Sequence, residues 1–202
     1  MKTIYLASKS PRRKELLRQV GIAFELLPLR HLPHERRDVD ETPLQGEAAL
    51  DYVLRIARLK AQAAVRIMVT RHLQQRLILA ADTTVVLEGA ILGTPADTDD
   101  AVRMLKRLSG QTHEVLTAIA VASRKDLQCA TSSSAVTFRP LNEKEIRQYV
   151  ATGEPLDKAG AYAIQGRAAA FISHLSGSYS GVMGLPLYET VRLLQVFETP
   201  TL

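Results

Sequence analysis

The strongest constraint on the fold is a long apolar pattern between about Gly46 and His72. Apolar residues recur there at helical spacing, at Leu50, Val53, Leu54, Ala57, Ala61, Ala64, Val65 and Met68. Such a stripe forms one face of an amphipathic helix and must be buried against another element. Short apolar segments typical of strands lie at Ile4–Ala7, Ile22–Leu27 and Leu77–Ala81. The pattern therefore predicts an α/β fold in which helices pack on a sheet.

The remaining segments predict the rest of the element order. We expect a hairpin at Val85–Leu87 and Ala90–Leu92, a helix from about Asp99 to Leu108, paired strands at His113–Ser123 and Thr131–Phe138, a strand at Ala169–Leu175 and a final helix opened by Pro186. Asn142 and Glu145 match a capping box, which predicts a helix running to about Ala151. The sequence of 202 residues contains no repeat or convincing linker, so a single domain over 1–202 is expected.

Charge and cysteine content narrow the function classes. The formal net charge of +5 favours an anionic partner, without separating a nucleotide from a nucleic acid or an acidic surface. Cys129 is the sole cysteine, which excludes an intrachain disulfide and fits a reducing cytoplasm. No apolar run approaches the roughly 20 residues that cross a bilayer, so no membrane partner is expected. The histidines lack zinc-ligand spacing, so any metal should be a hard cation such as Mg²⁺ or Mn²⁺.

The start of the first helix carries two arginines where cations are unfavourable. Ser10 is the expected N-cap and Pro11 the first helical residue, so Arg12 and Arg13 fall in the first turn. The helix dipole disfavours a cation there by about 0.3 to 1 kcal/mol, and an anion would offset this cost. Free backbone N–H groups, the hydroxyls of Ser8 and Ser10 and two guanidinium groups would make a phosphate site. An exposed basic helix start fits the same residues equally well.

Three other places carry candidate functional groups. Asp82 follows the strand Leu77–Ala81, where α/β folds place ligand-facing groups, and it would hold a metal, activate water or merely cap a turn. Lys60 continues an apolar stripe, so it is expected to be partly buried and either to extend to solvent or to meet an anion such as phosphate. The segment 153–166 mixes turn residues with both signs of charge, which fits a binding loop or a charged surface loop.

Taken together, these segments resemble the Maf family of nucleotide pyrophosphatases. The similarity is clearest at Leu6–Leu17, which looks like the N-terminal signature of that family. It continues through Asp40–Thr42, Ala57–Ala61, Ala81–Thr83, Leu105–His113 and Glu154–Tyr162. The resemblance implies an α/β fold with a central mixed β-sheet flanked by helices, in two lobes around a cleft.

The run Ile164–Gly166 and Thr83 look most like the branch of the family that hydrolyses dTTP and UTP. The resemblance implies attack of water at the α-phosphorus of a nucleoside triphosphate, with release of pyrophosphate and a nucleoside monophosphate. It assigns the proton acceptor to Asp82 and the selection of the base to Arg12, Thr83 and Gln165. It also suggests a homodimer.

Phosphoryl transfer depends on positioning and charge neutralisation, so hydroxyls and cations in these segments become candidate substrate contacts. The expected substrate-binding residues are Ser8, Ser10, Arg12, Arg13, Thr83, Lys158 and Gln165. Asp82 and Lys60 are the candidate catalytic residues, and Glu41 and Asp82 are the candidate ligands of a divalent metal cation.

The sequence departs from the family pattern at Thr94, where the family usually carries a lysine. Threonine donates one hydrogen bond and no charge, so weaker substrate binding or slower turnover is predicted. The stretch Leu29–Val39 also looks longer and more basic than usual, and Arg36 or Arg37 is a candidate replacement for the missing cation.

Two alternative functions compete with hydrolysis to pyrophosphate. A nucleic-acid or protein binding module would use the basic first helix and the stretch Arg30–Arg37. Acidic residues interleave with these cations, whereas a nucleic-acid surface prefers a continuous basic face with stacking aromatics, so no stable nucleic-acid complex is expected. A phosphatase that removes the γ-phosphate would differ in its products, which are orthophosphate and a diphosphate.

Overall fold

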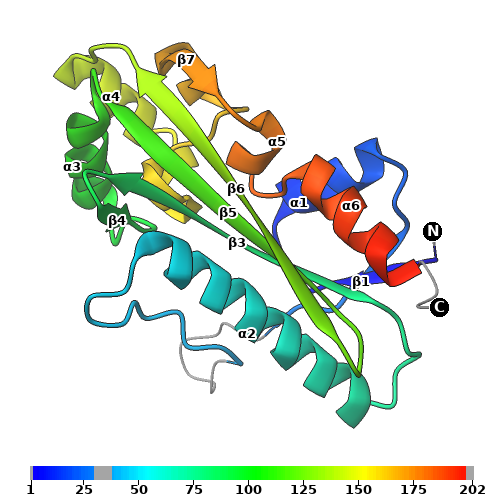
Figure 1. Ribbon diagram of the computed structural model, residues 1–202. Helices are drawn as coiled ribbons and strands as arrows, with labels where there is room; N and C mark the ends of the chain where they lie inside the picture. Colours follow the sequence, from blue (N-terminus) through cyan, green and yellow to red (C-terminus); the bar gives the residue numbers. More distant parts are fainter. Residues whose placement is uncertain (1, 30–37, 199–202) are drawn as a thin grey trace.

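A seven-stranded mixed β-sheet forms the centre of the protein, with helices on both of its faces (Figure 1). The computed structural model describes residues 2–29 and 38–198. The strands are β1 (Ile4–Leu6), β2 (Phe24–Leu26), β3 (Ile78–Leu87), β4 (Ala90–Leu92), β5 (Thr112–Ala122), β6 (Leu127–Phe138) and β7 (Ile172–Ser176). Their order is β2-β1-β3-β5-β6-β7, and β4 also pairs with β3. The pairs of β1 with β2 and β3 are parallel and the others are antiparallel, which confirms the predicted mixed sheet.

Except for the short helix at Tyr179–Val182, the α-helices begin and end close to predicted positions. They are α1 (Pro11–Gln19), α2 (Ala49–Thr70), α3 (Thr98–Leu108), α4 (Glu143–Val150), α5 (Tyr179–Val182) and α6 (Leu187–Glu198), with short 3-10 helices η1 (Glu154–Asp157), η2 (Ala159–Ala161) and η3 (Arg167–Phe171). The predicted N-cap of α1 is confirmed, because the Ser10 hydroxyl accepts a hydrogen bond from the backbone N–H of Arg13. The capping box of Asn142 and Glu145 at α4 is confirmed as well.

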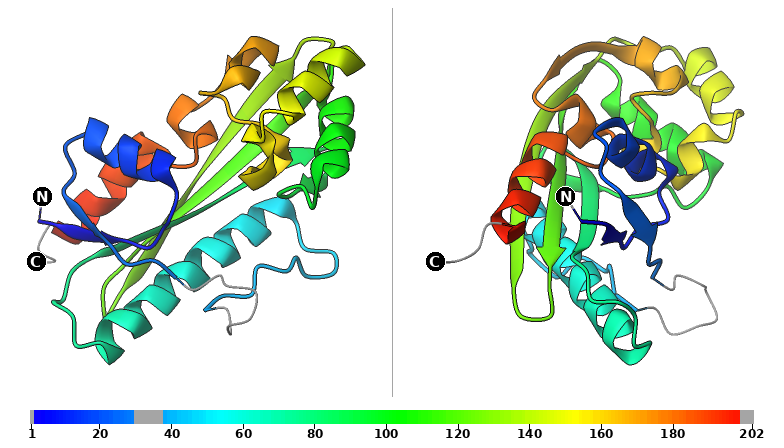
Figure 2. Two further views of the ribbon diagram at one scale, coloured as in Figure 1. Left: turned by 180° about the vertical axis from the view of Figure 1, so that it is seen from behind. Right: turned by 90° about the vertical axis from the view of Figure 1, so that its right-hand side faces the viewer.

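Three apolar clusters place the helices around the sheet. On one face, α2 packs through Val53, Ala57 and Ala64 against side chains such as Ala80 of β3 and Ala118 of β5. On the other face the helices form two groups, with α1 and α6 at one end of the sheet and α3 and α4 at the other (Figure 1 and Figure 2). Alternate side chains of the long strands enter these clusters from opposite faces. The two groups of helices correspond to the two predicted lobes.

The strand β3 differs from its prediction in a way that matters for function. The sequence predicts a strand at Leu77–Ala81 with Asp82 at its end, either facing a ligand or capping a turn. Instead β3 continues through this position, and its register with β5 is unbroken from Ile78 to Val86. Aspartate is depleted in strands when only local preference acts. Here continuous backbone pairing and a buried ion pair of Asp82 outweigh that preference.

The opposite edge of β3 has a gap in its strand pairing. β1 pairs with β3 only at Ile78 and Leu79, while β4 pairs with it only at residues 85–87. Figure 1 shows β1 and β4 near opposite ends of β3. Among the described strands, residues 80–84 therefore have a strand neighbour only in β5. Side chains from both faces of β3 meet at this open edge.

Two details near the C-terminus also differ from the sequence prediction. The strand expected at Ala169–Leu175 begins only at Ile172, because Arg167–Phe171 form the 3-10 helix η3. The short helix α5, capped by the Ser178 side chain, has no counterpart in the prediction. Within the described parts of the chain, no helix combines the length and apolar character that a membrane span requires.

Candidate active site

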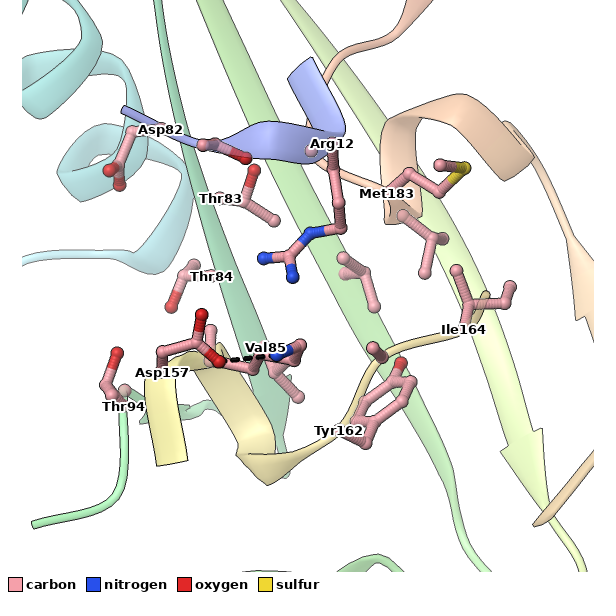
Figure 3. Close-up of a pocket in the computed structure, with 18 of the residues that line it drawn as sticks. Arg12, Asp82, Thr83, Thr84, Val85, Thr94, Asp157, Tyr162, Ile164 and Met183 are labelled. Carbon is pink, nitrogen blue, oxygen red and sulfur yellow. Dashed lines mark hydrogen bonds and ion pairs between the residues drawn. The ribbon is translucent and has the colours of Figure 1, made fainter. Parts of the chain in front are cut away.

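The largest set of candidate residues lines a cavity of about 290 Å³ at the open edge of β3 (Figure 3). The cavity brings together the start of α1, the middle of β3, the loop after β4, the segment 157–165 and the segment 182–184. The predicted residues along its wall are Ser10, Arg12, Arg13, Glu41, Asp82, Thr83, Thr94, Lys158 and Gln165. Segments that are distant in sequence thus meet in one site.

A buried lysine joins two carboxylates at one end of this cavity. The Lys60 Nζ donates hydrogen bonds to Asp82 Oδ1 at 2.8 Å and to Glu41 Oε2 at 3.0 Å. Lys60 is 9% exposed and Asp82 7%, which agrees with the burial predicted from the apolar stripe of α2. The anion that Lys60 meets within the protein is a pair of carboxylates. Breaking such a buried pair by removing one partner typically costs about 3 to 5 kcal/mol.

Glu41 is held in place by hydrogen bonds from α2. The Tyr52 hydroxyl donates to the Glu41 carbonyl at 3.1 Å. Arg55 donates to both carboxylate oxygens of Glu47, at 2.6 and 2.7 Å, and to the Thr42 carbonyl at 3.1 Å. Burial raises the pKa of Tyr52 to about 12, and the negative charges of Asp82 and Glu41 add to this effect. The segment that carries Glu41 is therefore fastened to the same helix as Lys60.

The two arginines of α1 differ in what they contact. Arg12 extends into the cavity, and within the described residues it has no hydrogen bond or ion pair (Figure 3). Arg13 instead donates from Nε to the Gly184 carbonyl at 2.7 Å and from Nη2 to Thr83 Oγ1 at 3.3 Å. Burial lowers the pKa of Arg13. Arg13 thus connects α1 with β3 and the segment 182–184, while Arg12 keeps its donors for a ligand.

Ser8 supports this arrangement from behind the cavity wall. Its hydroxyl accepts from the backbone N–H of Ser10 at 3.2 Å and from Nη1 of Arg13 at 3.3 Å. Ser8 is 8% exposed and is absent from the described cavity lining, unlike the other residues predicted to bind substrate. Its position is that of a group that orients Arg13.

Thr83 uses its own proton within the protein. The Thr117 hydroxyl donates to the Gly181 carbonyl at 2.8 Å. The 2.9 Å contact between the hydroxyls of Thr83 and Thr117 then requires Thr83 to be the donor. Because Thr83 also accepts from Arg13, its hydroxyl retains only acceptor capacity toward a ligand.

The segment 157–165 forms the wall opposite α1. Lys158 Nζ donates to the Glu154 carbonyl at 2.8 Å and to the Asp157 carboxylate, and it lines the cavity. Gln165 lies exposed at the cavity rim. Gly160 and Ala161 have positive φ angles of 66° and 59°. This left-handed turn directs the residues that follow it along the cavity, and it costs free energy at alanine.

Two residues that sequence reasoning missed support this wall. His113 Nε2 shares a 2.8 Å hydrogen bond with the Tyr162 hydroxyl, and the two rings meet edge to face. Burial lowers the pKa of His113 to about 4, so this imidazole is neutral near pH 7. In the sequence, His113 is one of several polar residues in the largely apolar stretch 113–122, and nothing local singles it out. Their partnership joins positions 49 residues apart, which no local pattern reveals.

The carboxylates present fit a hard divalent cation. Glu41 and Asp82 approach one point, the Nζ of Lys60, and both line the cavity. Among the described residues there is no group of three His, Cys, Asp or Glu side chains placed to hold a metal. Mg²⁺ and similar cations commonly use one or two carboxylates and complete their shell with substrate oxygens and water. The donor set at this end of the cavity is of that kind.

Comparison with known proteins places this chain in a family. The family model described as "Maf-like protein" matches residues 3–197. A dTTP/UTP pyrophosphatase of Aromatoleum aromaticum is 56% identical, over 98% of this chain and 96% of that protein. A dTTP/UTP pyrophosphatase of Dechloromonas aromatica is 52% identical, over 95% and 96% respectively. Among solved structures, the Staphylococcus aureus Ham1 protein has a similar fold, with a TM-score of 0.51 and 15% identity over 97% of both chains.

Proposed function

Because the chain belongs to the Maf family, we propose that it hydrolyses nucleoside triphosphates to a nucleoside monophosphate and pyrophosphate. The names of the two relatives support dTTP and UTP as its substrates. The observation that carries the proposal is the pairing of Lys60 with Asp82 and Glu41, two carboxylates that line the cavity into which Arg12 extends. Hydrolysis of a triphosphate needs cations that neutralise the phosphates and a carboxylate that accepts the proton of water, and this site offers both.

The triphosphate binds against the cations of the cavity. Arg12 supplies a guanidinium group without a partner among the described residues, and Lys158 supplies an ammonium group from the opposite wall. Ser10 and the backbone N–H groups at the start of α1 add donors with the favourable end of the helix dipole. Arg13 contributes charge but acts mainly through its contacts with Thr83 and Gly184.

Asp82 accepts the proton of the attacking water. The water oxygen forms a bond to the α-phosphorus, the bond from that phosphorus to the oxygen bridging to the β-phosphorus breaks, and pyrophosphate leaves with the electron pair. The hydrogen bond from Lys60 to Oδ1 fixes the carboxylate and leaves Oδ2 available to the water. Lys60 therefore positions Asp82 for proton transfer, and its second hydrogen bond positions Glu41.

Glu41 and Asp82 would hold a divalent cation, Mg²⁺ or Mn²⁺, together with oxygens of the substrate. Such a cation supplies neutralisation of charge on the phosphates and lowers the pKa of a bound water. Lys60 would keep both carboxylates oriented toward such a cation.

Arg12, Thr83 and Gln165 select the base. The side-chain amide of Gln165 offers one donor and one acceptor, which is the pattern required by the edge of uracil or thymine. Thr83 donates its hydroxyl proton to Thr117, so its oxygen can only accept a hydrogen bond from the base. We further propose that the protein acts in the cytoplasm as a homodimer and forms no stable nucleic-acid complex.

The experiment that tests the proposal identifies the products. The protein is incubated with dTTP, UTP and the other common nucleoside triphosphates in the presence of Mg²⁺ or Mn²⁺. We expect pyrophosphate and a nucleoside monophosphate as products, formed fastest from dTTP and UTP. Asp82→Asn should lower kcat about 10²- to 10⁴-fold. Asp99→Asn, on the exposed side of α3, is the matched control and retains activity.

Three outcomes contradict the proposal. Orthophosphate and diphosphate as products indicate a phosphatase that removes the γ-phosphate. Full activity of Asp82→Asn means that another group accepts the proton. Absence of hydrolysis, with nucleic-acid binding that weakens steeply as salt rises, indicates the binding module.

A further inference from the structure

The two ends of the cavity differ in chemistry as the two ends of a nucleotide do. Asp82, Thr94 and Asp157 lie toward one side of the close-up, and Ile164 and Met183 lie toward the other (Figure 3). Other apolar side chains in the cavity lining are those of Val85, Val115, Tyr162 and Val182. Lys60 binds Asp82 and Lys158 binds Asp157, so cations accompany both carboxylates of the charged end. A triphosphate therefore fits this end, which leaves the apolar end for the nucleoside.

Met183 occupies this apolar end on a backbone that is fixed from two sides. Arg13 Nε donates to the Gly184 carbonyl at 2.7 Å, directly after Met183. The buried Thr117 donates to the Gly181 carbonyl at 2.8 Å, shortly before it. Both donors also contact the Thr83 hydroxyl. The position of Met183 is therefore coupled to Thr83, a residue that the proposed function assigns to base selection.

At Gly184 the backbone passes beside Thr83, one of the residues proposed to select the base, and beside Arg13, which donates a hydrogen bond to Thr83. Gly184 has a φ of 106°, and a Cβ atom there would lie 3.4 Å from Thr83 Oγ1 and 3.5 Å from Arg13 Nε. Met183 is 8% exposed and Ile164 7%, and both belong to one apolar cluster. Their exposed atoms form an apolar surface of small area, since most of each side chain is buried. Such a surface suits a methyl group better than a charged or polar substituent.

We propose that Met183, together with Ile164, contacts the C5 edge of the pyrimidine and so distinguishes bases that carry an apolar substituent there. This inference rests on the proposed function, because it assumes a pyrimidine nucleotide in the cavity. The unbranched, polarizable side chain of methionine adapts to a substituent or to its absence, which permits both thymine and uracil to bind. The ligand class is that of pyrimidine nucleotides with hydrogen or a small apolar group at C5.

The test compares substrates that differ by one group. dTTP and dUTP differ only in the C5 methyl, and dUTP and UTP differ only in the 2′-hydroxyl. We expect Met183→Ala to lower the ratio of kcat/KM for dTTP over dUTP by about four-fold, the effect of one lost methyl contact. Met183→Leu keeps the volume and holds this ratio within about two-fold of the wild type. Val196→Ala, on the exposed surface of α6, is the control and leaves the ratio unchanged.

A second measurement uses the wild-type protein and does not depend on the folding of a variant. With 5-carboxy-dUTP, kcat/KM should fall at least about ten-fold below that for dTTP, because the apolar surface cannot solvate the carboxylate. Equal rates for these two substrates overturn the inference. A change in the dUTP to UTP ratio of Met183→Ala, in place of the dTTP to dUTP ratio, also overturns it, since Met183 then faces the sugar.

These results separate the inference from the proposed function. If the wild-type protein releases no pyrophosphate from any of these nucleotides, the proposed function fails and the C5 contact fails with it. If pyrophosphate is released and Met183→Ala keeps the wild-type ratio for dTTP and dUTP, the inference alone fails.

Discussion

The two ends of the cavity are organised by different forces. At the charged end, Lys60 binds Asp82 and Glu41 directly, so the side chains proposed to carry the chemistry also hold one another. At the apolar end, Ile164 and Met183 owe their positions to backbone contacts made by residues behind them, such as Arg13, Thr117 and the left-handed turn at Gly160. A substitution at the charged end should therefore change activity and stability together. At the apolar end the supporting residue and the contacting residue can be changed separately.

The largest expected effect follows from breaking the charged end with Lys60→Met. This variant leaves Asp82 buried beside Glu41 without a cation, so we expect a loss of about 3 to 5 kcal/mol in the free energy of unfolding. Activity should fall as well, by at least about 10², because Asp82 loses its orienting hydrogen bond. Chemical denaturation and steady-state kinetics measure the two losses. Lys144→Met, on the exposed side of α4, is the control. Normal activity with reduced stability would show that Lys60 has only a structural role.

At the apolar end, the support from His113 should make stability depend on pH. The pKa of His113 is lowered to about 4 in the folded protein by burial, from 6.5. The unfolded chain therefore binds a proton that the folded protein does not bind between these values, and stability falls as the pH drops from about 6.5 toward 4. The loss amounts to roughly 3 kcal/mol. Thermal unfolding measured across this range should show it, and the loss should be smaller in His113→Gln. An equal loss in the variant assigns the effect to other groups.

The neighbouring arginines test whether support and contact are separable. Arg13→Ala removes hydrogen bonds to Gly184 and Thr83 and should lower the free energy of unfolding by about 2 kcal/mol. Arg12→Ala removes a cation without a partner among the described residues, so it should raise KM about ten-fold and leave stability within about 0.5 kcal/mol of the wild type. Paired denaturation and kinetic measurements decide the matter. Equal effects on stability would mean that the two arginines have one role.

The smallest expected effect comes from adding charge with Thr94→Lys. Thr94 is exposed and lines the cavity near Asp157 (Figure 3). A lysine there adds a cation to the charged end, and KM for UTP should fall by about two- to five-fold, as expected for a partly solvated charge contact. Pyrophosphate release from UTP measures the change. Unchanged kinetics would mean that Thr94 does not weaken substrate binding.

The elements with strong local signals could be predicted from the sequence. The cap of α1 at Ser10, the capping box of α4 and the apolar stripe of α2 depend on residues only a few positions apart. The path of β3 through Asp82 could not be predicted in this way. It depends on pairing with β5 and on an ion pair with Lys60, which act across the sequence.

The candidate site, like the fold, could be predicted only in part from the sequence. Residues carried by the family resemblance line the cavity together, whereas Ser8 lies behind its wall and supports Arg13. Met183 and the pair of His113 and Tyr162 escaped prediction because an apolar or aromatic residue gives no sign of which cavity it will reach. Arg36 and Arg37, proposed to replace the cation missing at Thr94, lie outside the described residues.

The open edge of β3 lets neighbouring residues serve one cavity from opposite faces of a sheet. Asp82 reaches the helix α2 on one side through Lys60, and Thr83 reaches α1 on the other side through Arg13. A substitution at Thr83, proposed to select the base, should therefore leave the packing around Asp82, the proposed proton acceptor, intact. In evolutionary terms, the gap in strand pairing would let substrate choice and reaction chemistry change through separate substitutions, if Thr83 and Asp82 have the proposed roles.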